Sequence, residues 1–147
     1  DAELLADIDS VVATCCAIKA RIVEQDEFDT GLRMLLNFGH TLGHAVEQHF
    51  GYSCFTHGEG VAIGMYQLTK RTEELGMTAK GSAERIKSVL EKYNLPLTAG
   101  VEKAQLLDTM ARDKKKNGNS ITLIILQQIG ERVLQKVDWQ EVPRYLG

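Results

Sequence analysis

Residues 31–47 read GLRMLLNFGHTLGHAVE, and this stretch decides how the rest of the chain is interpreted. Its apolar residues recur at spacings of three and four, which predicts one amphipathic helix from about residue 32 to a C-cap at Gly51. Polar residues spaced by four, three, four and three fall on a neighbouring stripe, so the helix has a core face and a polar face. The polar stripe consists of Arg33, Asn37, His40, His44 and Glu47.

Two glycines lie inside this predicted helix. Gly39 and Gly43 each cost about 1 kcal/mol relative to alanine in a helix interior. Two glycines inside one helix indicate that another backbone or a ligand approaches the helix closely at these positions.

The histidines of the chain are clustered. All four, His40, His44, His49 and His57, fall in one short segment. Two imidazoles one helical turn apart, as at His40 and His44, are a recurrent zinc geometry. His57 opens a separate predicted helix, and a zinc ion normally takes ligands from separate elements. The pattern therefore favours a metal site built from these two segments.

A catalytic zinc site needs three protein ligands, and the histidines leave one to find. Asp29, Glu47 and Glu59 are candidates within the chain, and the spacing does not choose among them. The competing interpretation is a solvated helix face with incidental histidines, in which Glu59 simply caps its helix. The glycines between the histidines, and the arginine and asparagine in line with them, favour a binding site.

Positive charges suit an anionic substrate. Lys19, Arg33 and the run 114–116 can pair with a phosphate or carboxylate through charge-assisted hydrogen bonds. The alternative is structural: Lys19 extends from an amphipathic helix into solvent, and the lysine run is a charged turn.

The remainder of the chain predicts a mainly helical domain with one late β-hairpin. Helical periodicity covers four further segments, at about residues 2–23, 57–75, 83–93 and 101–112. The first of these helices carries an apolar stripe that is expected to be buried. A charged turn at 114–119 precedes short β-rich runs at 121–126 and 132–137, which meet at Gly130, and a brief helix over 139–145 closes the domain.

Composition is typical of one soluble globular domain. The 147 residues are 44% apolar and 25% charged, so the chain can bury its own core. A net charge of −3 gives no reason to expect a nucleic-acid partner, and no apolar run approaches the ~20 residues of a membrane span. An odd cysteine count, with two of the three adjacent, suits a reducing compartment, so a cytoplasmic location is expected.

Taken together, these residues resemble the 3-dehydroquinate synthase family of the shikimate pathway. The resemblance rests on LNFGHTLGHA at 36–45 followed by HGE at 57–59, with supporting matches at Lys19, at 31–33 and at 113–115. It spans nearly the whole chain and corresponds to the C-terminal, mainly helical half of that enzyme. The N-terminal α/β domain, which binds NAD in the family, is expected to lie outside this chain. Residues 1–147 then form a single metal- and substrate-binding domain.

The resemblance implies a lyase of aromatic amino-acid biosynthesis. The family converts 3-deoxy-D-arabino-heptulosonate 7-phosphate to 3-dehydroquinate and phosphate with NAD and a divalent metal, usually zinc or cobalt. NAD is regenerated within each turnover. The chain alone is expected to be inactive, with the N-terminal domain as its partner, and the full enzyme as a possible homodimer.

Residue roles follow from the resemblance position by position. His40 and His57 are implied to be metal ligands, and the third ligand is a glutamate upstream of this chain. Asp29 stands where the family commonly has a glutamate and is placed in the catalytic group. The other residues implied to line the substrate and phosphate pocket are Lys19, Arg33, Asn37, His44 and Lys115.

Two alternative functions compete with this one. Another sugar-phosphate cyclase or an iron-type polyol dehydrogenase shares the general architecture, although these relatives usually differ around the asparagine and the histidine run. The alternative from another class is a non-catalytic metal-binding module that kept the motif after losing the cofactor domain.

Overall fold

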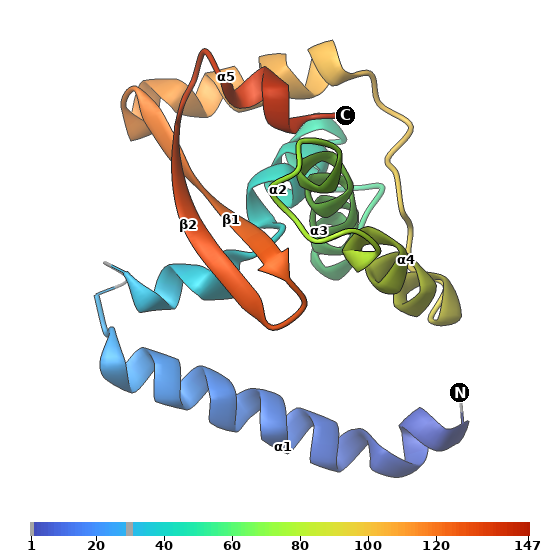
Figure 1. Ribbon diagram of the computed structural model, residues 1–147. Coiled ribbons are helices and arrows are strands. Elements are labelled where there is room, and N and C mark those ends of the chain that lie inside the picture. The colour runs from blue at the N-terminus through green and yellow to red at the C-terminus, as the bar shows by residue number, and fades with distance from the viewer. Residues whose placement is uncertain (1, 29–30) are drawn as a thin grey trace. The chain divides into compact units, whose positions relative to one another are not determined.

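The computed structural model describes residues 2–28 and 31–147, and the side chains of 4–28, 31–111 and 118–147. The chain divides into two compact units, residues 1–37 and residues 38–147. Figure 1 shows the elements of each unit along the chain. In the described part of the chain, no helix combines the length and the apolar character that crossing a membrane requires.

The first unit contains the long helix α1 (Ala2–Gln25) and the short 3-10 helix η1 (Leu32–Asn37). The carboxylate of Asp26 ties together the connection between them. Its Oδ2 accepts hydrogen bonds from the backbone N–H of Gly31 at 2.8 Å and of Arg33 at 2.9 Å. An aspartate that accepts from nearby backbone groups is a common way to stabilise a turn.

The helix predicted at the start of the chain is confirmed, but its apolar stripe is not buried within its own unit. Leu5, Val12 and Ile18 are exposed to 71%, 53% and 43%. The other helix of this unit, η1, has six residues, whereas α1 has 24. At a rise of roughly 1.5–2 Å per residue, so short a helix cannot cover the stripe.

The single helix expected over residues 32–51 is wrong, because the chain breaks at Gly39. Residues before the break wind as the 3-10 helix η1, and α2 (His40–His49) begins only after it. Gly39 has a φ of 79°, in the left-handed region that favours glycine. A Cβ at this position would lie 2.7 Å from both Val61 O and Met65 Cγ, so the close approach of another segment imposes the break.

That segment is α3 (His57–Glu74), which packs directly against α2 (Figure 1). A Cβ at Gly43 would lie 2.9 Å from the carbonyl carbon of Gly60. A Cβ at Gly64 would fall on the carbonyl oxygen of Gly39. The close backbone that Gly39 and Gly43 predicted is therefore confirmed, and it belongs to α3.

The rest of the second unit confirms a mainly helical fold with one late antiparallel hairpin. Its elements are α4 (Ser82–Lys92), α5 (Lys103–Asn117), β1 (Ser120–Gln128), β2 (Glu131–Asp138) and the 3-10 helix η2 (Val142–Tyr145). One local expectation is wrong: the charged turn at 114–119 is helical as far as 117. Charged residues are compatible with a helix, and the break comes at Gly118, with a φ of 79°.

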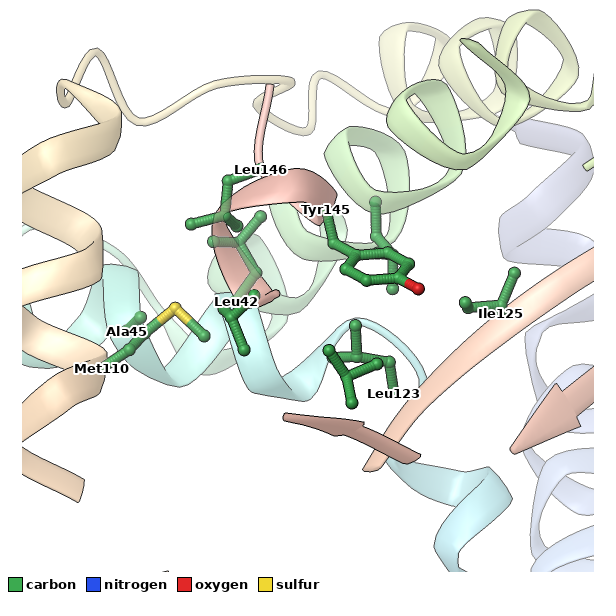
Figure 2. Close-up of a cluster of buried hydrophobic side chains, with 10 residues drawn as sticks. Leu42, Ala45, Met110, Leu123, Ile125, Tyr145 and Leu146 are labelled. Carbon is green, nitrogen blue, oxygen red and sulfur yellow. The ribbon is translucent and has the colours of Figure 1, made fainter. Parts of the chain in front are cut away.

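The core of the second unit holds α2 in a fixed orientation (Figure 2). Leu42 and Ala45 of α2 are buried together with Met110 of α5 and with Leu123 and Ile125 of β1. Because this apolar face of α2 is buried in the core, His40 and His44 lie on another side of the helix. The core therefore decides where the histidines of α2 point.

Candidate metal centre

Three imidazole rings meet at the start of α2 and the start of α3. His40 and His44 are one turn apart on α2, and His57 is the first residue of α3. The ring centroids are 5.5 Å apart for His40 and His44, 5.1 Å for His40 and His57, and 5.7 Å for His44 and His57. We call these three residues the histidine cluster. The fourth histidine, His49, packs its ring against Phe50 instead.

A backbone carbonyl orients His40. Its Nδ1 lies 3.2 Å from the carbonyl oxygen of Phe38. Because a carbonyl oxygen can only accept, Nδ1 carries the proton in this hydrogen bond and Nε2 keeps its lone pair. The carbonyl belongs to the turn at Gly39, so the break that the sequence did not predict contributes directly to the cluster.

A buried carboxylate lies beside His57. Oε1 and Oε2 of Glu47 are 3.2 and 3.3 Å from His57 Nδ1. The side chain of Glu47 is 8% exposed and that of His57 is 57% exposed. Ligand atoms of His44, Glu47 and His57 all lie within 4.8 Å of one another, close enough to hold one metal ion.

The position of His57 is set by a capping box at the start of α3. Thr56 Oγ1 accepts from the Glu59 N–H at 3.3 Å, and Glu59 Oε2 accepts from the N–H and the hydroxyl of Thr56, each at 2.8 Å. These bonds from the Thr56 N–H and then its hydroxyl lower the pKa of Glu59. Sequence reasoning recognised Glu59 and missed Thr56, although Thr-x-x-Glu at 56–59 is the usual signal for this cap.

Of the three acidic candidates for a third ligand, the structure brings Glu47 to the histidine cluster. Glu59 accepts hydrogen bonds from Thr56 instead, and Asp29 lies outside the described residues. The sequence placed Glu47 on the polar stripe but contained no signal that it would be buried against His57, which is ten residues further along the chain.

Comparison with known proteins identifies the family of this chain. The family model described as 3-dehydroquinate synthase C-terminal matches residues 2–116. The chain belongs to the 3-dehydroquinate synthase family. The 3-dehydroquinate synthase of Clostridium acetobutylicum is 46% identical over 147 residues, and that of Enterococcus faecalis strain OG1RF is 38% identical over 146. Both alignments cover 99% of this chain and 41% of the relative, so the chain spans about two fifths of these synthases.

Two solved structures share the fold of this dehydroquinate synthase region. A 2-deoxy-scyllo-inosose synthase complexed with carbaglucose-6-phosphate, NAD⁺ and Co²⁺ aligns with a TM-score of 0.76 and 17% identity, over 95% of this chain and 40% of its own. A 2-epi-5-epi-valiolone synthase from Streptomyces hygroscopicus subsp. jinggangensis, with NAD⁺ and Zn²⁺ bound, aligns with a TM-score of 0.70 and 20% identity, over 85% and 35%. At these identities the likeness shows the fold alone.

Three other described residues predicted for a dehydroquinate synthase site belong to the first unit. Lys19 is exposed on α1, and Asn37 is exposed at the end of η1. Nη1 of Arg33 donates to the carbonyl oxygen of Glu27 at 2.8 Å. The side chain of Lys115, which belongs to α5 of the second unit, lies outside the described residues. The grouping of these residues with the histidine cluster stays a prediction.

Proposed function

We propose that this chain forms the metal- and substrate-binding domain of a 3-dehydroquinate synthase. The full enzyme would convert 3-deoxy-D-arabino-heptulosonate 7-phosphate to 3-dehydroquinate and phosphate, a carbon–oxygen lyase reaction of aromatic amino-acid biosynthesis, with NAD and a divalent metal. The observation that carries this proposal is the convergence of His40, His44 and His57 in a chain of this family.

The donors of the histidine cluster fit zinc or cobalt, because both metals bind imidazole nitrogen well. Nδ1 of His40 lies 3.2 Å from Phe38 O, and Nδ1 of His57 lies 3.2 Å from Glu47 Oε1. An oxygen at Nδ1 leaves Nε2 as the ligand atom, which is the usual arrangement around metal-binding histidines. We assign His40 and His57 as two ligands and a glutamate from the N-terminal part of the full enzyme as the third.

A divalent metal bound here would supply Lewis acidity, which stabilises the alkoxide formed before a hydroxyl is oxidised. His44 lies beside both assigned ligands, with ring centroids at 5.5 and 5.7 Å, and is itself exposed. We assign His44 to hold or relay a proton between substrate and solvent, because imidazole titrates near neutral pH.

Cationic side chains complete the proposed substrate pocket. Lys19, Arg33 and Lys115 would offset the charge of the phosphate through charge-assisted hydrogen bonds. Asn37 would accept from or donate to the hydroxyl groups of the sugar chain, and the Asp29 carboxylate would accept from them. This grouping follows the residues that match the family motif, together with Asp29, which stands where the family commonly has a glutamate.

NAD binding is assigned to the remaining length of the full enzyme. The chain alone is expected to be inactive, because two of the three metal ligands and none of the NAD site are assigned to it. A sister cyclase is less well supported, since those structures are 17% and 20% identical, whereas the 3-dehydroquinate synthases are 46% and 38% identical.

A cytoplasmic location is part of the same proposal. The thiols of Cys15, Cys16 and Cys54 are free and exposed, which suits a reducing compartment such as the cytoplasm.

A chimera tests the proposal. The N-terminal part of the Clostridium acetobutylicum enzyme is joined to this chain, which matches that enzyme at 46% identity over 147 residues. With NAD and zinc, the chimera is expected to release phosphate from the heptulosonate phosphate, and the chain alone is expected to release none. His57→Ala in the chimera should reduce phosphate release to the level of a metal-free sample. The matched control His49→Ala, outside the cluster, should keep it.

Either of two results would reject this function. A folded, zinc-loaded chimera that leaves the heptulosonate phosphate unchanged would support a non-catalytic module. Turnover of a hexose 6-phosphate in place of the heptulosonate phosphate would support a sister cyclase.

A further inference from the structure

Glu47 is an unusual residue for its place in the fold. Among the residues whose side chains are described, it is the only acidic or basic one that is buried, at 7% exposure. Removing a carboxylate from water costs free energy unless a partner offsets the loss of hydration. Apolar packing between α2 and α3 does not require a carboxylate. The presence of Glu47 therefore has to be explained by the group that its carboxylate contacts.

The site of Glu47 is shaped to admit a side chain from α2 against the backbone of α3. A Cβ at Gly60 would lie 3.2 Å from Glu47 Cγ and 3.6 Å from its Cδ, and the glycine leaves that space free. The end of α2 is also held, because the Tyr52 N–H donates to the carbonyl oxygen of Glu47 at 2.8 Å. Glu47 is therefore fixed at its backbone and confined along its side chain.

From this position the carboxylate lies against Nδ1 of His57. Both of its oxygens lie at nearly the same distance from His57 Nδ1, 3.2 and 3.3 Å. His57 is 57% exposed, so its ring is held from the buried side at Nδ1 while the rest remains accessible. A carboxylate oxygen can only accept, which places the proton of a neutral His57 on Nδ1.

We propose that Glu47 is a positioning residue for the metal centre. It accepts the Nδ1 proton of His57, and thereby keeps Nε2 unprotonated and the ring fixed for metal binding. The inference rests on the proposed function insofar as His57 is taken to be a metal ligand. A carboxylate behind a metal-binding histidine fixes the tautomer and raises the basicity of the ligand nitrogen, and losing such a partner typically weakens metal binding about 10- to 100-fold.

The unmodified chain provides the first test. A long-range ¹H–¹⁵N NMR spectrum of the metal-free chain, recorded at about pH 8 where a typical imidazole is neutral, reports which nitrogen of His57 is protonated. The His57→Ala spectrum assigns the signals. We expect the Nδ1–H tautomer, and the Nε2–H tautomer would overturn the proposal without any need for a Glu47 variant.

Metal affinity provides the second test. Glu47→Leu removes the acceptor, and Gln48→Leu places the same side chain at the next position of α2 as a matched control. In zinc titrations by calorimetry, Glu47→Leu is expected to bind about 10- to 100-fold more weakly than the unmodified chain, and Gln48→Leu equally well. Unchanged affinity in Glu47→Leu would overturn the proposal, and a Glu47→Leu variant that fails to fold would leave the NMR test decisive.

Cobalt absorption separates positioning from direct ligation. If Glu47 only positions His57, the visible spectrum at Co²⁺ saturation keeps its shape in Glu47→Leu, because the ligand atoms are unchanged. A changed spectrum would mean that Glu47 is itself a ligand, and would overturn the proposal as stated. These results are independent of phosphate release by the chimera, so the failure of one proposal can be distinguished from the failure of the other.

Discussion

At Gly64, the absence of a side chain decides whether α2 and α3 can pack as they do. A Cβ there would fall on the carbonyl oxygen of Gly39, at the break that precedes α2. The obstacle is backbone, which cannot move aside as the end of a flexible side chain can. The histidine cluster spans the same helix pair, so its geometry depends on this contact.

Gly64→Ala is therefore expected to lower the free energy of unfolding by about 3 kcal/mol, as overpacking against a rigid neighbour does. Gly58→Ala, in the first turn of the same helix, is the matched control. Apart from its chain neighbours and its own helix backbone, no atom in the described part of the chain lies within 4 Å of a Cβ at Gly58, so alanine should be neutral or stabilise by up to ~1 kcal/mol. Urea unfolding followed by circular dichroism measures both, and equal midpoints for the two variants would contradict the close packing.

At the scale of elements, α4 depends on its neighbour α3 for its cap. Gly81, the N-cap residue of α4, has no side chain with which to accept the first N–H groups of the helix. Glu73 of α3 does so instead, accepting from the N–H of Gly81 at 2.9 Å and of Ala83 at 3.0 Å. The bonds from Ala83 and then Gly81 lower the pKa of Glu73, so its ionised form is favoured in the folded state.

Glu73→Gln is expected to destabilise the protein at pH 7 and to lose this effect in acid. The pKa of Glu73 in the folded protein lies below the ordinary glutamate value of 4.5, so the contribution is complete above that value and disappears as the pH falls through the folded pKa. Urea unfolding of the unmodified chain and the variant at pH 7 and about pH 3 measures this dependence. Glu74→Gln, which loses only an exposed ion pair with Arg71, is the control and should change little at either pH. A destabilisation by Glu73→Gln that is as large in acid as at pH 7 would rule out capping by the ionised carboxylate.

At the scale of the whole molecule, the two units differ in how much of their apolar surface they bury. The second unit has a continuous core that joins α2, α5 and the hairpin. In the first unit, Leu5 and Val12 of α1 are exposed to 71% and 53%. A helix without a packed face has little to stabilise it beyond its own hydrogen bonds.

Amide hydrogen exchange should reveal this difference. The amides of α1 are expected to exchange at least about a hundredfold faster than those of Ile63 and Leu68, which are buried in α3. The buried and exposed helices are compared within one NMR sample. Equal protection of α1 and α3 would mean that the stripe is covered in solution, and repeating the measurement at lower protein concentration would show whether a second copy covers it.

Local pattern alone was enough to predict α1, α3, α4, the late hairpin and the segments that carry the histidines. Helical periodicity and β-rich runs depend on neighbours in the chain, and they placed α3, α4 and the hairpin close to their observed bounds. The same is true of Gly39 and Gly43, whose cost within a helix indicated a close backbone. The resemblance carried by 36–45 and 57–59 was likewise readable from sequence, because that motif is chemically specific.

Only the tertiary structure decided how these pieces meet. The break at Gly39 arises from the approach of Val61 and Met65, which are more than twenty residues away and leave no periodic signal before it. The choice of Glu47 over Glu59 as the acid beside His57 depends on the packing of α2 against α3, with Gly60 providing the space. Periodicity shows which side of a helix is apolar, but contacts between distant segments determine what covers that side and which polar groups face one another.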